Sequence, residues 1–248
     1  MGFTLEGLAR FEADLVVLPE NWVSPGPVGE HDYLEAVEGV AAEAPGAVVV
    51  GAQYIDVGGS VASLGLAYRD GKLWRLCEKL FPSVAVGERS FVEPGRLRGP
   101  LEVGGWRVSC SVCVDIFYPE LARIQALIQG AQVILNPSKI PEDRVQLWRS
   151  ALLARASENS VYVVGVNAAG ERYKDGREVI GGSAVYTPDG RPLLEAGWGR
   201  ASYIVELDPE RIAYARVRWA FRMDAERLFG EFYRRAYEAL TREGGKVD

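Results

Sequence analysis

Continuous apolar runs at 14–20 and 161–167 predict β-strands that are buried on both faces, and a similar run at 132–136 predicts a third strand. Apolar residues recur at helical spacing over 31–44 and 142–159, which predicts amphipathic helices between the strands. The chain therefore alternates strands and helices. This order indicates an α/β protein whose sheets are covered by helices.

Weaker patterns predict the remaining elements. They comprise strands at 47–55, 60–69, 72–78, 101–112, 191–196 and 201–207, a strand and turn at 181–190, and helices at 4–12, 209–216 and 224–241. Asp70-Gly71 is a hairpin signal between two of these strands. Residues 83–100 form a long irregular connection, and such loops are often functional. We find no linker, repeat or low-complexity segment, so residues 1–248 are expected to form a single domain.

The stretch around Cys113 predicts a turn between a strand and a helix. The β-prone run Trp106–Val112 leads to it, and apolar residues at helical spacing follow up to Gly130. A thiol at such a bend is exposed, as in a nucleophile elbow, and the N–H groups at a helix start would lower its pKa and favour the thiolate. From this stretch alone, a buried structural cysteine is the alternative.

The chain has three cysteines, Cys77, Cys110 and Cys113, which do not form an even-numbered disulfide framework. Cys110 and Cys113 spell CxxC, so a thiol redox protein is one alternative. The pair precedes the turn, however, and residues three apart along a strand point to opposite faces. Cys77 is most simply a packing residue.

Composition excludes several classes of function. His31 is the only histidine, so a Cys/His zinc site lacks ligands, and no metal or cofactor is expected. If Cys113 is a nucleophile, its base is therefore expected to be a carboxylate. The net charge of −6 argues against a nucleic-acid partner. No apolar run approaches the roughly 20 residues that span a bilayer and no signal peptide opens the chain, so a cytoplasmic protein is expected.

Two charged residues at strand ends are candidates for the chemistry. Glu20 ends the buried strand 14–20, and α/β proteins place their active sites at such strand ends. Lys79 follows an apolar strand end in a chain whose positive charge is mostly arginine. A compact ammonium suits a developing oxyanion in a tight site better than a guanidinium does. For both residues the alternative is a solvated surface charge.

Three stretches carry a family resemblance: Leu18–Glu20, Glu78–Pro82 and Cys113–Glu120. In this order they resemble the nitrilase, or carbon–nitrogen hydrolase, superfamily and its Glu–Lys–Cys triad. Supporting matches are Gly87-Glu88, Phe91–Gly95, Gly130–Ile134, Ala154–Asn159, Tyr162–Val164, Asn167, Gly181–Ser183 and Pro188–Gly190. The resemblance runs from about residue 14 to residue 235.

The resemblance implies a four-layer α-β-β-α sandwich and a homodimer or higher homo-oligomer that associates through helices. It implies a cysteine-dependent hydrolase of a small non-peptide C–N compound that forms a thioester intermediate. Among such compounds we rank a carboxamide or ω-amide first, an N-carbamoyl compound second and a nitrile last. The sequence leaves open whether water or another acceptor takes the acyl group.

The matching positions also imply roles for individual residues. Cys113 is the expected nucleophile and Glu20 its general base. The Lys79 ammonium and the backbone N–H of Val114 are expected to hold the oxyanion. Glu88 matches a second glutamate that positions the lysine or the substrate in many members.

The start of the chain departs from the family pattern. Only thirteen residues precede Asp14, where members carry a strand and a longer helix. Either the usual N-terminal strand is missing, with local compensation, or the true start lies upstream of Met1. This departure favours a catalytically silent nitrilase-like scaffold as the alternative function. The intact Glu20, Lys79 and Cys113 argue against that alternative.

Overall fold

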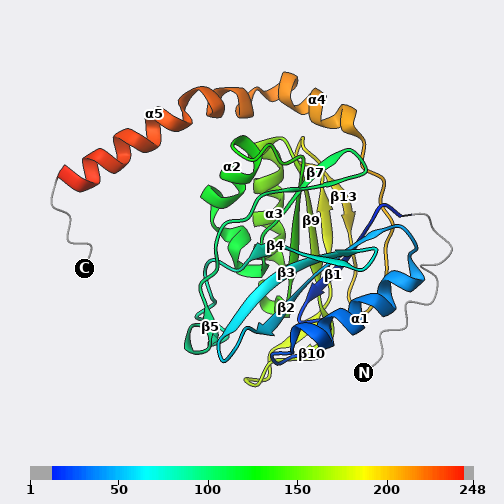
Figure 1. Ribbon diagram of the computed structural model, residues 1–248. Coiled ribbons are helices and arrows are strands. Elements are labelled where there is room, and N and C mark those ends of the chain that lie inside the picture. The colour runs from blue at the N-terminus through cyan, green and yellow to red at the C-terminus, as the bar shows by residue number, and fades with distance from the viewer. Residues whose placement is uncertain (1–12, 243–248) are drawn as a thin grey trace.

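Two β-sheets lie face to face in the computed structural model, which describes residues 13–242 (Figure 1). The first sheet has the order β1-β2-β3-β4, with β5 paired to β3: β1 (Leu15–Glu20), β2 (Val48–Asp56), β3 (Val61–Arg69), β4 (Lys72–Glu78) and β5 (Val92–Glu93). The second has the order β13-β12-β9-β8-β7-β6: β6 (Leu101–Val103), β7 (Trp106–Cys110), β8 (Val133–Ser138), β9 (Tyr162–Asn167), β12 (Ala184–Tyr186) and β13 (Pro192–Glu195).

Helices cover the outer face of each sheet. Helix α1 (Glu30–Glu43) packs on β2 and β3, and it buries Tyr33, Val37 and Val40 against the first sheet. Helices α2 (Pro119–Leu127) and α3 (Val145–Asn159) pack side by side, and α3 covers β9 and β12. A Cβ at Gly165 of β9 would lie 2.4 Å from Leu152 of α3, so the missing side chain lets helix and sheet approach closely. The expected α/β four-layer α-β-β-α sandwich is therefore confirmed.

The topology brings several strand ends to one edge of the sandwich. β1 is parallel to β2, and β4 runs in the same direction because β3 is antiparallel to both β2 and β4. In the second sheet β7, β8 and β9 are parallel neighbours. β1 contacts β8 and β9 across the interface, and β4 contacts β7. The residues that follow β1, β4 and β7 can therefore converge on one site.

Several sequence predictions differ from the structure. The strand expected over 101–112 is a hairpin, because Gly104 and Gly105 turn the chain with φ of 56° and 82° between β6 and β7. Residues 201–207 form no strand, so that prediction is wrong. A hairpin of β10 (Ala169–Arg172) and β11 (Glu178–Ile180) was not predicted.

The predictions for the chain start fall largely on residues that are not described. The helix expected over 4–12 lies outside the described residues. Within the described residues β1 pairs only with β2 and forms an edge of its sheet. The expectation that the usual N-terminal strand is missing therefore concerns residues outside those described.

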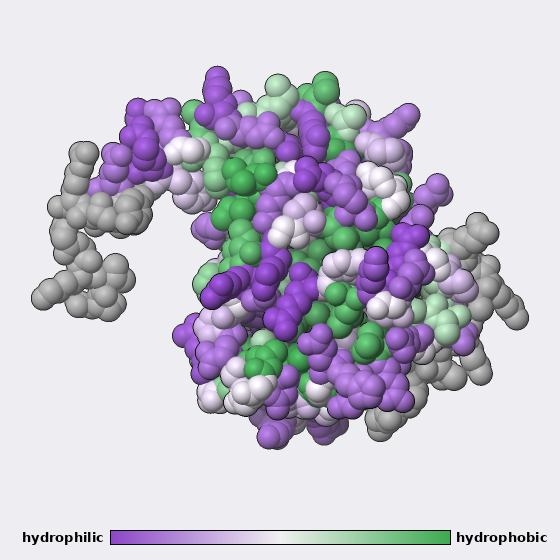
Figure 2. Space-filling model, in the orientation of Figure 1, coloured by the Kyte–Doolittle hydropathy of each residue, from purple (hydrophilic) through white to green (hydrophobic). Residues whose placement is uncertain are grey.

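Helices α4 (Pro209–Trp219) and α5 (Phe221–Arg242) form an arm that leaves the body of the sandwich (Figure 1). Asp208 caps α4 by accepting a 2.8 Å hydrogen bond from the N–H of Glu210. The arm exposes large apolar side chains, among them Leu228 and Phe232, and Figure 2 shows apolar surface between the arm and the body. Among the described helices, none combines the length and apolar character needed to cross a bilayer.

A disulfide between Cys77 and Cys110 links the two sheets. Cys77 lies near the end of β4 and Cys110 ends β7, and both are buried. A Cβ at Gly65 would lie 2.2 Å from the Cys77 sulfur, so the absent side chain makes room for the bond. Cys77 is thus a bonding partner rather than only a packing residue. The Cys110–Cys113 pair of a thiol redox protein is not formed, because Cys113 is free.

Candidate active site

Cys113 lies at a sharp bend between the second sheet and α2. β7 ends at Cys110, and the 3-10 turn η3 (Cys113–Phe117) begins at the cysteine. Its φ of 50° falls in the left-handed region, which a non-glycine residue adopts only at a cost. This geometry matches the predicted elbow at the strand end. The thiol, however, is buried rather than exposed.

Glu20, Lys79 and Glu88 meet the thiol in one buried cluster. Lys79 Nζ lies 2.8 Å from Glu20 Oε1 and 2.6 Å from Glu88 Oε1, and so donates to both carboxylates. The Cys113 thiol lies close enough for the charges of Glu20, Lys79 and Glu88 to act on its pKa. The four residues are between 1% and 7% exposed. The structure thus brings together all four side chains that the sequence singled out, and the surface-charge alternative for Glu20 and Lys79 is wrong.

A second layer of hydrogen bonds fixes the carboxylate of Glu88. The hydroxyl of Tyr54 on β2 donates to Glu88 Oε1 at 2.6 Å, so this oxygen accepts from both the tyrosine and the lysine. The N–H of Ser83 donates to Glu88 Oε2 at 2.5 Å. Glu88 begins the short turn η2 (Glu88–Ser90) inside the long 83–100 connection. That connection therefore delivers a carboxylate to the cluster.

Asp115 ties the Lys79 segment to the Cys113 turn. Its carboxylate accepts hydrogen bonds from the N–H of Leu80 at 2.8 Å and the N–H of Phe81 at 3.0 Å. Burial raises the pKa of Asp115 to about 6, although these two N–H donors oppose the rise. One side chain thus holds the residues that follow Lys79 against the turn that carries the thiol.

Asn136 of β8 holds the backbone of the same turn from the other side. Its Nδ2 donates to the carbonyl oxygens of Ser111 at 2.7 Å and Cys113 at 3.1 Å. Its Oδ1 accepts from Trp148 Nε1 of α3 at 2.7 Å. The nitrogen and the oxygen of the buried Asn136 amide are thus both hydrogen-bonded, and a fully satisfied buried network of this kind favours a single geometry.

The pKa of the thiol differs from the sequence prediction. Burial raises the pKa of Cys113 well above 9.0, and the negative charge of Glu20 raises it further, while Lys79 acts in the opposite direction. The expected lowering by a helix start is wrong, because the cysteine opens a short 3-10 turn and α2 begins only at Pro119. The resting thiol is therefore protonated and has to lose its proton to a neighbour before it can react.

Burial and charge act in opposite directions on the two partners of the ion pair. Burial raises the pKa of Glu20 above 4.5, and the neighbouring Lys79 only partly offsets this rise. Burial alone would lower the pKa of Lys79, but the carboxylates of Glu20 and Glu88 outweigh it and raise the pKa well above 10.5. The cluster therefore holds a permanent cation beside a carboxylate that accepts protons readily.

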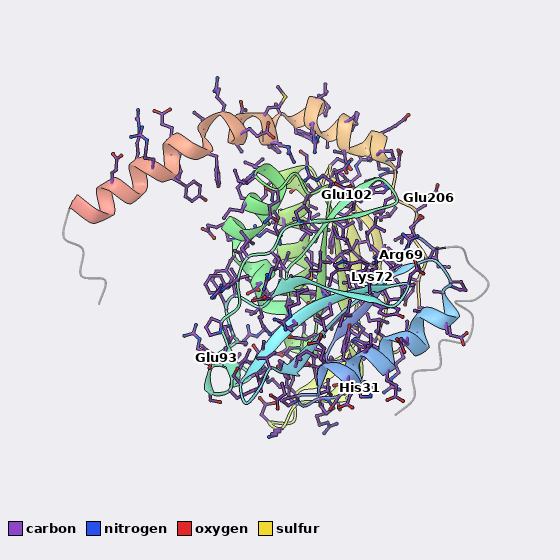
Figure 3. All side chains as sticks on the ribbon, in the orientation of Figure 1. His31, Arg69, Lys72, Glu93, Glu102 and Glu206 are labelled. Carbon is purple, nitrogen blue, oxygen red and sulfur yellow. A yellow bond between two sulfur atoms is a disulfide. The ribbon has the colours of Figure 1, made fainter. Side chains whose placement is uncertain are left out.

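Other sequence candidates lie as follows. Val114 follows the cysteine in η3 and is half-buried. His31 lies at the surface on α1 (Figure 3).

Tyr54 and Asn136 were not singled out from the sequence. Asn136 ends an apolar run before a proline, a signal that could have found it, whereas nothing in the apolar run of β2 distinguishes Tyr54.

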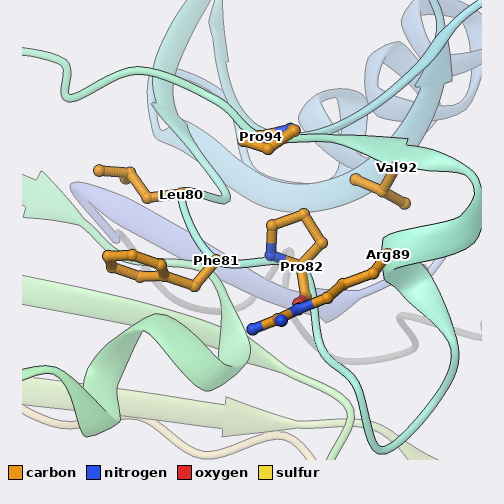
Figure 4. Close-up of a pocket in the computed structure, with 6 residues that line it drawn as sticks. All are labelled: Leu80, Phe81, Pro82, Arg89, Val92 and Pro94. Atoms are coloured by element: carbon orange, nitrogen blue, oxygen red, sulfur yellow. The ribbon is translucent and has the colours of Figure 1, made fainter. Parts of the chain in front are cut away.

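A shallow surface hollow of about 330 Å³ adjoins the cluster (Figure 4). It is lined by Leu80, Phe81, Pro82, Arg89, Val92 and Pro94. None of the four clustered residues lines it, so it adjoins the chemistry rather than containing it. Within residues 13–242, no three histidine, cysteine or carboxylate side chains lie together in a way that could hold a metal ion.

Comparison with known proteins identifies the family. The family model for carbon–nitrogen hydrolases matches residues 39–217. An (R)-stereoselective amidase from a Pseudomonas species is 31% identical over 224 residues, which cover 83% of this chain and 77% of the relative. A 2-oxoglutaramate amidase from Bacillus subtilis is 28% identical over 214 residues, which cover 82% of this chain and 82% of the relative.

Solved structures show the same fold. A carbon–nitrogen hydrolase superfamily protein from Xanthomonas campestris superposes with a TM-score of 0.75 at 24% identity, over 88% of this chain and 87% of that one. The chain therefore belongs to the carbon–nitrogen hydrolase family, within the nitrilase superfamily. It is an amidase-type carbon–nitrogen hydrolase.

Proposed function

We propose that this enzyme hydrolyses a small linear amide through a thioester on Cys113, with Glu20 as general base. One observation carries the proposal: Glu20 and Lys79 are bonded to each other at 2.8 Å in a buried cluster, close enough to Cys113 for both charges to act on the pKa of its thiol. A weakly acidic thiol, a carboxylate of raised pKa and a permanent cation are the parts that acyl transfer from an amide requires.

The steps follow from the positions of these groups. Glu20 takes the thiol proton, and the Cys113 sulfur attacks the amide carbon. The Lys79 ammonium and the backbone N–H of Val114 stabilise the negative oxygen of the tetrahedral intermediate. Glu20 then gives its proton to the leaving nitrogen, and ammonia or an amine departs from the thioester. Water, deprotonated by Glu20, attacks the thioester and releases the carboxylic acid and the thiol.

Glu88 acts in the proposal as a positioning residue. Its Oε1 accepts from Lys79 and from Tyr54, so it fixes the direction in which the ammonium points. Both partners are buried, and the bond therefore keeps its strength in the absence of water.

The relatives support an amide as the substrate class. Both are named amidases, one for its stereoselectivity and one for 2-oxoglutaramate, which is itself an ω-amide. We accordingly rank a carboxamide or ω-amide above an N-carbamoyl compound, and a nitrile last. Water is the acyl acceptor that we propose, and a non-water acceptor such as hydroxylamine is the alternative to test.

Two measurements test the function together. We expect a panel of small amides to release ammonia, and iodoacetamide to label Cys113 in the native protein, since Cys77 and Cys110 are bonded to each other. Added substrate is expected to slow the labelling. If no amide releases ammonia and Cys113 is not labelled, the catalytically silent scaffold takes the place of the hydrolase.

The pH dependence of the reaction follows from Glu20. The base must be ionised, and burial raises its pKa above 4.5. We therefore expect kcat/KM to fall as the pH is lowered through this raised pKa, at a higher pH than for an ordinary glutamate. The profile of Glu102→Gln, which removes an exposed glutamate, is the control (Figure 3). An acid limb at or below the ordinary value would contradict the role of Glu20.

We further propose a homodimer or higher homo-oligomer in the cytoplasm, in which a second copy covers the α4–α5 arm. The arm exposes Leu228 and Phe232, one helical turn apart on α5, and apolar surface of this kind marks association sites. Light scattering is expected to give at least twice the chain mass of 27.2 kDa. The double variant Leu228→Glu, Phe232→Glu is expected to be monomeric. A monomeric wild type would overturn this proposal.

A further inference from the structure

Lys79 and Cys113 reach the cluster from two different sheets. Lys79 follows β4 of the first sheet, and its backbone N–H donates to the carbonyl oxygen of Ser63 on the neighbouring strand β3 at 2.9 Å. Cys113 follows β7 of the second sheet, where Asn136 of β8 holds its carbonyl oxygen. Among the described residues, no ladder of backbone hydrogen bonds joins β4 to β7. The distance between ammonium and thiol therefore depends on what links the two sheets.

The Cys77–Cys110 disulfide links the sheets just before both catalytic residues. Cys77 precedes Lys79 by two residues. Cys110 precedes Cys113 by three residues. The Cα atoms of the two bonded cysteines are 5.4 Å apart, and both side chains belong to the buried core between the sheets. The strand that delivers the cation is thus covalently bonded to the strand that delivers the nucleophile.

The first sheet is shaped to admit this bond. The pairing of β3 and β4 shifts register beside Gly65, which pairs with Cys77, so that Leu76 is the extra residue of a β-bulge. Bulges of this kind re-aim neighbouring side chains and are common beside active sites. A Cβ at Gly65 would lie 2.9 Å from the Cys110 sulfur, so the glycine leaves room for a bond from the opposite sheet.

Asp115 links the same two segments on the other side of the catalytic residues. Its buried carboxylate accepts hydrogen bonds from the N–H groups of Leu80 and Phe81. The disulfide thus lies before Lys79 and Cys113 along the chain, and the Asp115 hydrogen bonds lie after them. Of the two links only the disulfide is covalent, so it is the one that water cannot replace.

We propose that Cys77 and Cys110 are positioning residues for the amidase reaction, because their disulfide holds two catalytic side chains in register across the sheets. These side chains are the Lys79 ammonium and the Cys113 thiol. The inference rests on the proposed function, in which the ammonium stabilises the oxyanion that forms when the sulfur attacks. No bond of the disulfide is made or broken in the reaction. Register matters at such a site, because a misplacement of about 1 Å can cost about 100-fold in rate.

Two double variants that lack the disulfide test the inference. The pair Cys77→Ala, Cys110→Ala deletes both sulfurs, and the pair Cys77→Ser, Cys110→Ser keeps nearly the same volume without the bond. We expect both to melt about 5–15 °C below wild type, because the bond closes a loop over a sequence separation of 33. At a temperature well below every melting point, we expect kcat to fall about 10-fold with KM nearly unchanged.

Val37→Ala is the control for a general loss of stability. Val37 of α1 is fully buried in the separate core between this helix and the first sheet, so its truncation also lowers the melting temperature. It should keep the wild-type kcat and KM. A further measurement checks the bond itself: alkylation of the unreduced protein in denaturant is expected to label one cysteine, Cys113.

The outcomes separate this inference from the proposed function. If wild type releases ammonia but either double variant keeps its kcat, or if Val37→Ala loses kcat to the same extent, the positioning role is overturned. Alkylation of all three cysteines in the unreduced protein would also overturn it, because the bond would not exist. If Cys113→Ala keeps full activity, the proposed nucleophile fails instead, while the alkylation count, which does not depend on activity, still decides whether the disulfide exists.

Discussion

Replacement of Cys113 by alanine is expected to lower kcat about 10⁴-fold or more, which is the scale at which loss of a covalent nucleophile acts. The reason lies in the geometry of the cluster. The thiol lies where the charges of Glu20 and Lys79 act on it, and Cys113, with a φ of 50°, lies at the bend where β7 gives way to η3. Alanine keeps the backbone but removes the atom that forms the thioester.

Cys113→Ser is the informative companion variant. A hydroxyl can still donate to Glu20, so the buried carboxylate keeps a partner, but serine is a much weaker nucleophile at its ordinary pKa. We expect Cys113→Ser to unfold at a temperature close to that of wild type and to lose nearly as much kcat as alanine. The measurement is the rate of ammonia release by each variant, after mass spectrometry has verified the substitution. Activity of the alanine variant within tenfold of wild type would exclude Cys113 as the nucleophile.

The sequence predicts the framework of the sandwich because its central strands carry an unambiguous signal. Leu15–Leu18 and most of 161–167 are apolar, a pattern typical of strands covered on both faces. β1 and β9 lie within a residue or so of the predicted bounds, 14–20 and 161–167. Once the strands are placed, a carboxylate at the end of the first one falls at the functional edge, so Glu20 is accessible to sequence reasoning.

The second layer of the site is not accessible in this way. β2 is buried along nearly its whole length, so its pattern does not show that Tyr54 faces Glu88. The β10–β11 hairpin is short and largely polar, so its strands give no periodic signal, although Asp175-Gly176 is a turn signal that could have found it. The chain around it also contacts Ala85 and Lys139, which are distant in sequence.

The pKa of Cys113 shows how tertiary burial can override a local rule. The strand-to-helix pattern predicted a thiol beside a helix start, where the pKa falls. In the structure a 3-10 turn separates Cys113 from α2, and the thiol is enclosed beside a carboxylate. Desolvation then dominates and raises the pKa. Sequence periodicity locates the bend, but the charge state of the thiol depends on which distant residues close over it.

Lys79→Met is expected to lower kcat about 10²- to 10³-fold, the usual effect of losing one oxyanion donor, and to destabilise the fold as well. The ammonium is bonded to Glu20 at 2.8 Å and Glu88 at 2.6 Å, and none of the three side chains is more than 2% exposed. Methionine fills similar volume but leaves two like charges buried without a cation. Removing one partner of such a buried pair costs about 3–5 kcal/mol of unfolding free energy.

The pH dependence of the lost unfolding free energy distinguishes an unpaired buried charge from a packing defect in Lys79→Met. Without the ammonium, the folded-state pKa of Glu20 rises further above its unfolded value, so its protonated form is favoured in the fold. The contribution of Glu20 is then retained at acid pH and lost as the pH rises through the raised pKa. We therefore expect the variant to be most destabilised at neutral pH and to approach wild-type stability on acidification. Denaturant unfolding at several pH values measures this.

Lys72→Met is the matched control, because the same substitution is made at the exposed start of the strand that ends beside Lys79 (Figure 3). It should change kcat and unfolding free energy little. A Lys79→Met variant whose destabilisation does not vary with pH would mean that Glu20 is not held as a buried charge. A Lys79→Met variant with the kcat of wild type would show that the ammonium does not act on the oxyanion.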